Sequence, residues 1–306
     1  MEFKRFTKKN IAVNAILVAT YLLWISFIGG IKSESVILVI LWLVTFYAHD
    51  KSRRFILGFS TFIVFWIIYD SMRIIPNYEV SAIHIREPYE IEKVLFGFNF
   101  NGNLLTPNEY FSIVNNRFLD FLSGFFYINW MPIPLGFGIY LYLKDKYLFL
   151  TYSLVFLIAN LLGFAIYYIY PAAPPWYVEL YGFDLHLGVP GNRAGLIRFD
   201  ELIGMPVFEG IYNKNANVLA AMPSLHAAYP VIVLYFAAKS KVNYITKMLF
   251  TIFILGIWFS AVYSNHHYII DVIMGALVAL VTIFVFEKAA NTDVIRSKLM
   301  NVCAKI

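Results

Sequence analysis

Two stretches of the sequence decide its fold: AMPSLHAAYP, residues 221–230, and YSNHHYIIDVIMG, residues 263–275. In the second stretch, His267 and Asp271 are four residues apart, and on a helix this spacing places both side chains on one face. The residues that follow, 272–286, are almost wholly apolar, which predicts a membrane-spanning helix with polar residues at its mouth. Because ionisable groups at membrane depth are costly and usually functional, we expect the functional site here.

The composition predicts an integral membrane protein. Of the 306 residues, 60% are hydrophobic and only 14% are charged, which is more apolar surface than a soluble domain can bury. The net charge of +5 comes without a long basic run, so we expect no nucleic-acid partner. Cys303 is the single cysteine, which excludes an intrachain disulfide and a cysteine-based metal site.

The apolar runs predict an all-α fold, a polytopic membrane helical bundle of about eight spans. Each run reaches roughly 17–25 residues alone or with its flanking residues. The second and third runs are short, and a hairpin that only dips into the bilayer is the alternative for that pair. The runs are residues 11–30, 36–48, 55–69, 118–143, 147–170, 218–238, 245–263 and 268–286.

Lysine and arginine are unevenly distributed among the loops. Every second loop is basic, starting with the segment before the first run, and this pattern predicts that both termini lie in the cytoplasm. The other loops then lie outside, and His226 and His267 fall at the outer ends of their helices. We therefore expect a multi-pass protein whose active site is at the external face, periplasmic or lumenal.

Four parts of the chain follow from this topology. We expect N-terminal membrane spans in residues 1–70, an external interfacial loop in 71–117, a catalytic membrane core in 118–290 and a cytoplasmic tail in 291–306. The external loop mixes charged and apolar residues, as do short helices that lie on a bilayer surface.

The first histidine stretch has the pattern of a helix start. Pro223 and Ser224 precede an apolar run, and Ser224 is suited to the N-cap position. A helix N-terminus offers free N–H groups to a phosphate, and His226 in the first turn could protonate a leaving oxygen. A capped helix whose histidine is satisfied by the backbone is the structural alternative.

The second stretch is typical of an activated nucleophile. Asp271 can accept a hydrogen bond from one ring nitrogen of His267, which leaves the other nitrogen free to attack. His266 has Ile270 at the corresponding position and lacks this support, so we expect it to contact substrate or to face the interface. The two histidines with one carboxylate therefore suit phosphoryl transfer through a histidine.

A metal site is the rival chemical interpretation. His226, His267 and Asp271 are all ligand types for zinc. The sequence has no HExxH motif or comparable two-histidine helix motif, so we expect neither a metal nor a soluble cofactor.

The motifs MPSLHAAYP and HHYIIDVIMG, with YPAAPPW before them, resemble the type 2 phosphatidic acid phosphatase (PAP2) superfamily. More narrowly they resemble its Aur1-like branch of inositol phosphorylceramide synthases. The resemblance extends from about Glu90 to Gly275. It implies a PAP2-like core in which His267 is the nucleophile, Asp271 its orienting partner and His226 the general acid and base.

Two departures from the phosphatases of the superfamily favour the transferase branch. Their K-x6-R-P motif is absent, and Ser260-Ala261 stands where they have Ser-Arg ahead of the nucleophilic histidine. Other groups must then bind the phosphate. We expect Ser224, His266 and the loop cations to contribute. The cations, in order of preference, are Arg198, Arg193 and Lys214.

The resemblance implies a lipid phosphotransferase that moves a phospho-head group, such as inositol phosphate from phosphatidylinositol, to ceramide or a related lipid. The expected partners are therefore membrane lipids, including diacylglycerol-type lipids, and the sequence does not set the oligomeric state. Two alternatives stay open. One is a PAP2-type phosphatase acting on lipid phosphates or polyprenyl pyrophosphate, and the other is a transporter or binding protein that holds an anion.

Overall fold

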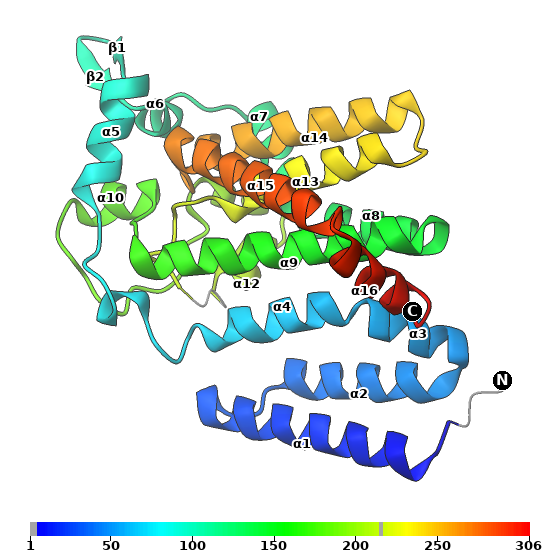
Figure 1. Cartoon of the computed structure of the whole chain (residues 1–306). Coiled ribbons are helices and arrows are strands. Elements are labelled where there is room, and N and C mark those ends of the chain that lie inside the picture. Colours follow the sequence, from blue (N-terminus) through cyan, green and yellow to red (C-terminus); the bar gives the residue numbers. More distant parts are fainter. Residues whose placement is uncertain (1–4, 214–216) are drawn as a thin grey trace.

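The computed structural model describes residues 5–213 and 217–306, and most of its long helices run roughly along one axis (Figure 1). The all-α prediction is confirmed. The N-terminal helices are α1 (Lys8–Gly29), α2 (Ser33–Ala48), α3 (Asp50–Gly58) and α4 (Ser60–Ser71). The long helices that follow are α8 (Pro132–Lys144), α9 (Lys146–Ile169), α13 (Leu225–Lys239), α14 (Tyr244–Tyr263) and α15 (Ile269–Ala290), and α16 (Asp293–Cys303) is the last.

Shorter elements lie in the two long segments that connect these helices. The first segment holds η1 (Asn77–Glu79), α5 (Arg86–Phe96), the antiparallel hairpin of β1 (Phe98–Phe100) and β2 (Asn103–Leu105), α6 (Pro107–Ile113) and α7 (Arg117–Ile128). The second holds α10 (Pro175–Tyr181), η2 (Ala194–Leu196), α11 (Ile197–Ile203) and α12 (Val207–Tyr212).

Polar side chains mark where several helices begin. The Asp145 carboxylate accepts hydrogen bonds from the N–H groups of Tyr147 and Leu148 at the start of α9. Thr106 and Glu109 form a reciprocal capping box at the start of α6. These side chains satisfy N–H groups that have no partner within the helix, so the sequence specifies the helix starts locally.

The apolar helices make this a membrane protein, but the predicted count of about eight spans is not confirmed. Within the described residues, α1, α9, α14 and α15 are long and apolar enough to cross a bilayer. A fifth span is added if α3 and α4, which meet at a 46° bend, are counted as one. Helices α2 and α13 are apolar but shorter than 18 residues.

The prediction of one continuous span over residues 118–143 is wrong. Helix α7 ends at Ile128 and α8 starts at Pro132, so the run is divided into two helices. A proline has no N–H to donate and is best accommodated in the first turn of a helix, which favours a new start at this point. After the break the two helices part, because α7 packs on α14 while α8 packs on α9.

The two ends of the bundle differ in what they carry (Figure 1). The C-terminus, the start of α1 and the short connections from α2 to α3, α8 to α9 and α13 to α14 gather at one end. Elements α5, α6 and α10 lie at the other end. The loops identified above as basic are therefore on the same side of the bundle, opposite the two long connecting segments.

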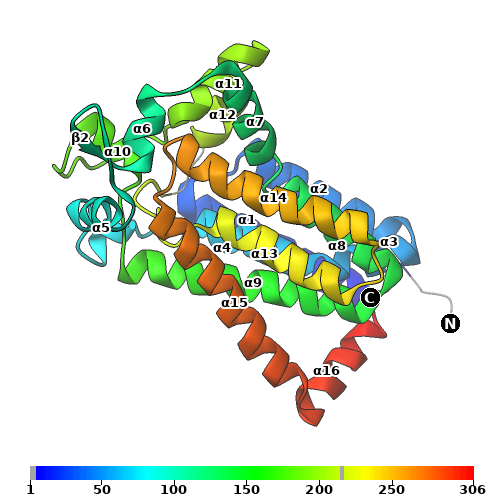
Figure 2. The same ribbon diagram turned by 90° about the horizontal axis from the view of Figure 1, so that it is seen from above.

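Helix α9 runs through the centre of the largest buried cluster of side chains. Its Phe156 ring packs against Phe62 of α4 at 5.2 Å and against Tyr229 of α13 at 4.6 Å between ring centroids. Seen from above, α9 and α13 lie close together beneath α14 and α15 is tilted across them (Figure 2). Buried aromatic contacts of this kind fix the relative positions of the helices.

The start of α13 is held directly against α15. The Ser224 N–H donates to the Asp271 carbonyl at 2.9 Å. A Cβ atom added to Gly275 would lie 2.0 Å from the Ser224 carbonyl oxygen and 3.3 Å from the Ala227 Cβ. Only glycine allows the two backbones to approach this closely.

We expect Gly275→Ala to destabilise the protein, because the clash is with backbone that cannot move aside. Overpacking of this kind costs about 1–3 kcal/mol. Gly136→Ala on α8 is the matched control, because nothing lies within 4 Å of a Cβ added there. Thermal unfolding of the detergent-purified proteins measures both. An unchanged melting temperature for Gly275→Ala would contradict the close contact.

Candidate active site

His226 lies in the first turn of α13, as the sequence predicts. The Ser224 hydroxyl accepts a hydrogen bond from the Ala227 N–H at 3.3 Å, which confirms Ser224 as the N-cap. The Ser224 side chain is fully buried in this role. Its expected contact with substrate stays a prediction.

His267 and Asp271 are close together, but they do not share a helix face. Helix α15 begins at Ile269, so His267 precedes it, and the expectation of a helical pair is wrong in this respect. The Asp271 Oδ2 accepts the Tyr268 N–H at 2.9 Å and lies 3.6 Å from the His267 Nδ1. The turn into the helix therefore brings the carboxylate to the ring, at ion-pair distance and beyond hydrogen-bonding distance.

The two histidines face one cavity of about 610 Å³. Their ring centroids are 5.8 Å apart. The walls are mainly apolar and aromatic, and they come from α4, α9, α12, α13 and the break between α7 and α8. They include Phe65, Trp66, Tyr69, Met72, Trp130, Met131, Phe164, Tyr167, Tyr212 and Tyr229.

A tyrosine that sequence reasoning missed contacts His226. The Tyr127 hydroxyl is 3.3 Å from the His226 Nδ1, and it also hydrogen-bonds to Tyr212. A hydrogen bond between Tyr127 and Nδ1 leaves Nε2 of His226 free to exchange a proton: the imidazolium form can give one up as a general acid, and the neutral form can take one as a general base. Tyr127 lies inside a predicted apolar span with no motif around it, so nothing in the sequence distinguishes it from the other aromatic residues.

Trp130 is the second residue that the sequence did not indicate. It lies in the break between α7 and α8, and its ring meets the His226 ring edge-on at 4.6 Å. The indole therefore restricts the imidazole from a second direction. Hydropathy predicted a continuous helix over these residues, and that prediction gave no reason to place Trp130 beside His226.

His266 is buried beside the catalytic candidates and also lines the cavity. Its Nε2 is 3.0 Å from the Arg193 carbonyl, and its ring stacks on Tyr212 at 4.3 Å. Burial lowers the pKa of His266 to about 3, so the ring is neutral at physiological pH. Because a carbonyl only accepts, the Nε2 carries the proton and donates it.

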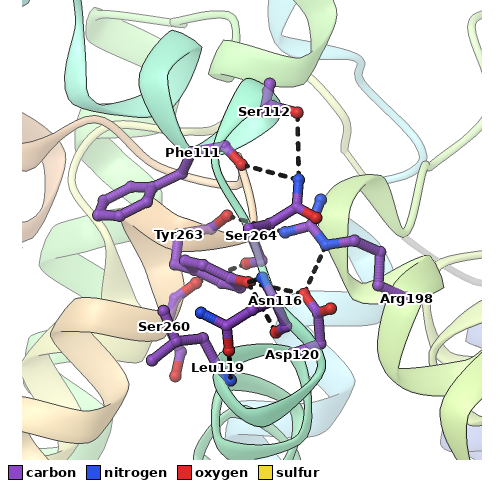
Figure 3. A network of polar contacts seen from close by, with 10 residues as sticks. Phe111, Ser112, Asn116, Leu119, Asp120, Arg198, Ser260, Tyr263 and Ser264 are labelled. Carbon is purple, nitrogen blue, oxygen red and sulfur yellow. Dashed lines mark hydrogen bonds and ion pairs between the residues drawn. The ribbon is translucent and has the colours of Figure 1, made fainter.

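Neither predicted arginine is among the described residues that line the cavity. Arg198 Nε donates to Asp120 Oδ1 at 2.6 Å, and the Tyr263 hydroxyl donates to the same oxygen at 2.7 Å (Figure 3). Arg193 pairs with Asp200 at 2.9 Å and Glu209 at 3.1 Å. Their expected role in phosphate binding stays a prediction.

Two further predictions concern ligands of the site. Lys214, the third candidate cation, lies outside the described residues. Across residues 5–213 and 217–306, no cluster of three or more histidine, cysteine, aspartate or glutamate side chains is arranged to hold a metal ion.

Comparisons with known proteins identify the family of the chain. A family model described as "PAP2 superfamily" matches residues 106–285. The chain is 46% identical to phosphoinositol dihydroceramide synthase from Bacteroides thetaiotaomicron over 282 residues, which are 92% of each protein. No solved structure matches the chain.

Fungal proteins are more distant relatives. Inositol phosphorylceramide synthase from Candida albicans is 26% identical over 82% of this chain and 52% of its own length. The catalytic subunit of inositol phosphorylceramide synthase from Saccharomyces cerevisiae is 25% identical over 78% of this chain and 58% of its own length. The chain thus spans a little over half of the fungal proteins. With the family model covering more than half of the chain and a relative 46% identical over nearly all of it, the chain belongs to the PAP2 superfamily.

Proposed function

We propose that the protein is an integral-membrane lipid phosphotransferase that moves phosphoinositol from phosphatidylinositol to a ceramide-type lipid. The observation that carries this proposal is the pair of histidines, His226 and His267, that face one aromatic-walled cavity in a chain 46% identical to a phosphoinositol dihydroceramide synthase. An apolar cavity with a few convergent polar groups suits amphiphilic substrates.

The geometry supports a two-step displacement. In the first step, the His267 Nε2 attacks phosphorus, the bond from phosphorus to the diacylglycerol oxygen breaks, and His226 gives that oxygen a proton. The product on the enzyme is a phosphohistidine that carries inositol. In the second step, the primary hydroxyl of the ceramide attacks phosphorus and gives its proton to His226, and the bond to His267 breaks. Both histidines return to their starting states.

The charge of the cavity favours a phosphodiester donor. Within the described residues, its lining contains no arginine or lysine, and its polar groups include three histidines. A phosphodiester carries one negative charge, whereas a phosphomonoester carries about 1.5 to 2 at pH 7. The described part of the lining is better matched to the smaller charge, which supports a phosphodiester donor.

We also propose an orientation in the membrane. The basic loops and the C-terminus share one end of the bundle, and α13 and α15, which start beside the two histidines, begin toward the other (Figure 1). The positive-inside rule then places both termini in the cytoplasm and the active site at the external face. On this proposal the segment from 71 to 117 is external, and residues 118–290 form the catalytic core.

His267→Ala is expected to abolish transfer, because no other group is placed to replace the nucleophile. In detergent micelles with labelled phosphatidylinositol and ceramide, we expect a loss of about 10³-fold or more. His186→Ala, an exposed histidine outside the cavity, is the control. Inositol phosphate released equally well without ceramide would indicate a hydrolase, and transfer retained by His267→Ala would refute the proposed nucleophile.

Tyr127→Phe is expected to reduce kcat by about 10²-fold while leaving KM nearly unchanged, because it removes the hydroxyl that sets the His226 proton. Tyr152→Phe is the matched control. Tyr152 is also fully buried, but its hydroxyl donates to the Pro134 carbonyl at 2.8 Å and not to a histidine. Equal effects of the two substitutions on kcat would show that the Tyr127 contact is only structural.

A further inference from the structure

The loop between α14 and α15, residues 264–268, carries His266 and His267 and is held by backbone hydrogen bonds from distant segments. The Gly195 N–H donates to the Ser264 carbonyl at 2.9 Å, and the Trp176 N–H donates to the Asn265 carbonyl at 3.1 Å. These bonds hold the first half of the loop. They do not reach the backbone of His267 or the first turn of α15.

Asn108, from α6, reaches the backbone of His267. Its side-chain amide donates to the His267 carbonyl and to the Val262 carbonyl, each at 3.0 Å. The side chain is almost fully buried. One amide group therefore ties the last turn of α14 to the proposed nucleophile.

Glu92, from α5, reaches the start of α15. Its two carboxylate oxygens accept the N–H groups of Ile269 and Ile270, at 3.0 Å and 3.1 Å. These are the first two N–H groups of the helix, which have no partner within it. The carboxylate is completely buried, and the helix dipole favours a negative charge at this position.

Asp271 is the third residue of α15. Its Oδ2 accepts the N–H of Tyr268, the residue at the N-cap, as in a capping box, and it also lies 3.6 Å from the His267 Nδ1. The two carboxylates thus have separate tasks. Glu92 accepts the first two N–H groups of α15, whereas Asp271 accepts the N–H of the preceding residue and faces the imidazole.

We propose that Glu92 and Asn108 are positioning residues for His267, so that the segment 71–117 holds the proposed nucleophile against the bundle. The inference rests on the proposed function, because it assigns these residues to the reaction that His267 performs. The reach of the two side chains supports it: both come from this one segment, Asn108 binds the His267 carbonyl, and Glu92 binds the N–H groups two and three residues after it. A misplacement of about 1 Å at a reacting group can cost 10²-fold in rate.

The charge on Glu92 adds a pH dependence. Burial, with a smaller contribution from the nearby Asp271 charge, raises the pKa of Glu92 from 4.5 to about 7, even though the two N–H groups oppose the shift. Tyr268 faces the same carboxylate, and Lys93, Tyr89 and Glu109 form a neighbouring hydrogen-bonded group. Only the charged form accepts both N–H groups at once, so activity is expected to fall as the pH drops below about 7.

Stability should have the opposite dependence. Since the pKa of Glu92 is higher in the folded protein than in the unfolded chain, its contribution to stability is present at low pH and is lost as the pH rises from 4.5 to about 7. The charged carboxylate is therefore a cost to folding above neutrality. A residue that served only to stabilise the fold would not lower stability in its active charge state. The charged form of Glu92 lowers stability and is the form expected to support activity.

Glu92→Gln separates these roles, because it keeps the shape and removes the charge. At about pH 8, we expect kcat to fall tenfold or more, KM to stay within about twofold, and the melting temperature to be unchanged or higher. The loss of activity below pH 7 that the wild type shows should be flattened. The control is Glu90→Gln, on the same helix but half exposed, which should keep the wild-type pH profile.

Asn108→Ala gives a second, independent arm, with a loss of kcat expected at every pH and no change in the shape of the profile. Wild-type kcat and pH profile in Glu92→Gln would overturn the inference. So would a loss of kcat that is matched by a lower melting temperature and leaves the pH profile unchanged. His267→Ala is assayed in parallel: if it retains transfer, the proposed function itself fails, and if it is inactive while Glu92→Gln is normal, only the positioning role fails.

Discussion

The hydrogen bond from the Ser224 N–H to the Asp271 carbonyl ties together the starts of the two helices that carry the chemistry. It is possible only because Gly275 lets the two backbones approach closely. His226 is two residues from one end of this bond, and His267 is four residues from the other. This backbone contact therefore helps to set the distance between the two rings, while the aromatic packing around α9 holds the helices that make it.

Motifs and caps predicted the site better than hydropathy predicted the spans. Ser224 as N-cap follows from a short-range rule that the sequence displays directly, and His267 and Asp271 are close together as expected, although they do not share a helix face. The division of residues 118–143 into two helices does not follow from hydropathy, because a continuous helix and an interrupted one can have the same run of apolar residues. Prolines 132 and 134 were the available signal.

The supporting residues were out of reach for a different reason. Glu92 and Asn108 act across 154 to 178 residues of sequence, and Tyr127 acts across 99. Local patterns carry no information about such contacts. The predicted arginines show the converse: a loop cation looks available for phosphate in the sequence, but its carboxylate partner, such as Asp120 for Arg198, is visible only in the fold (Figure 3).

The break between α7 and α8 also bears on the shape of the cavity. Trp130 and Met131, together with residues of α4, form cavity wall on elements other than the two histidine-bearing segments. Part of the cavity wall is thus carried by helices that bear neither histidine. Substitutions of the α4 residues can therefore change the shape of the cavity without changing a residue of the two histidine segments.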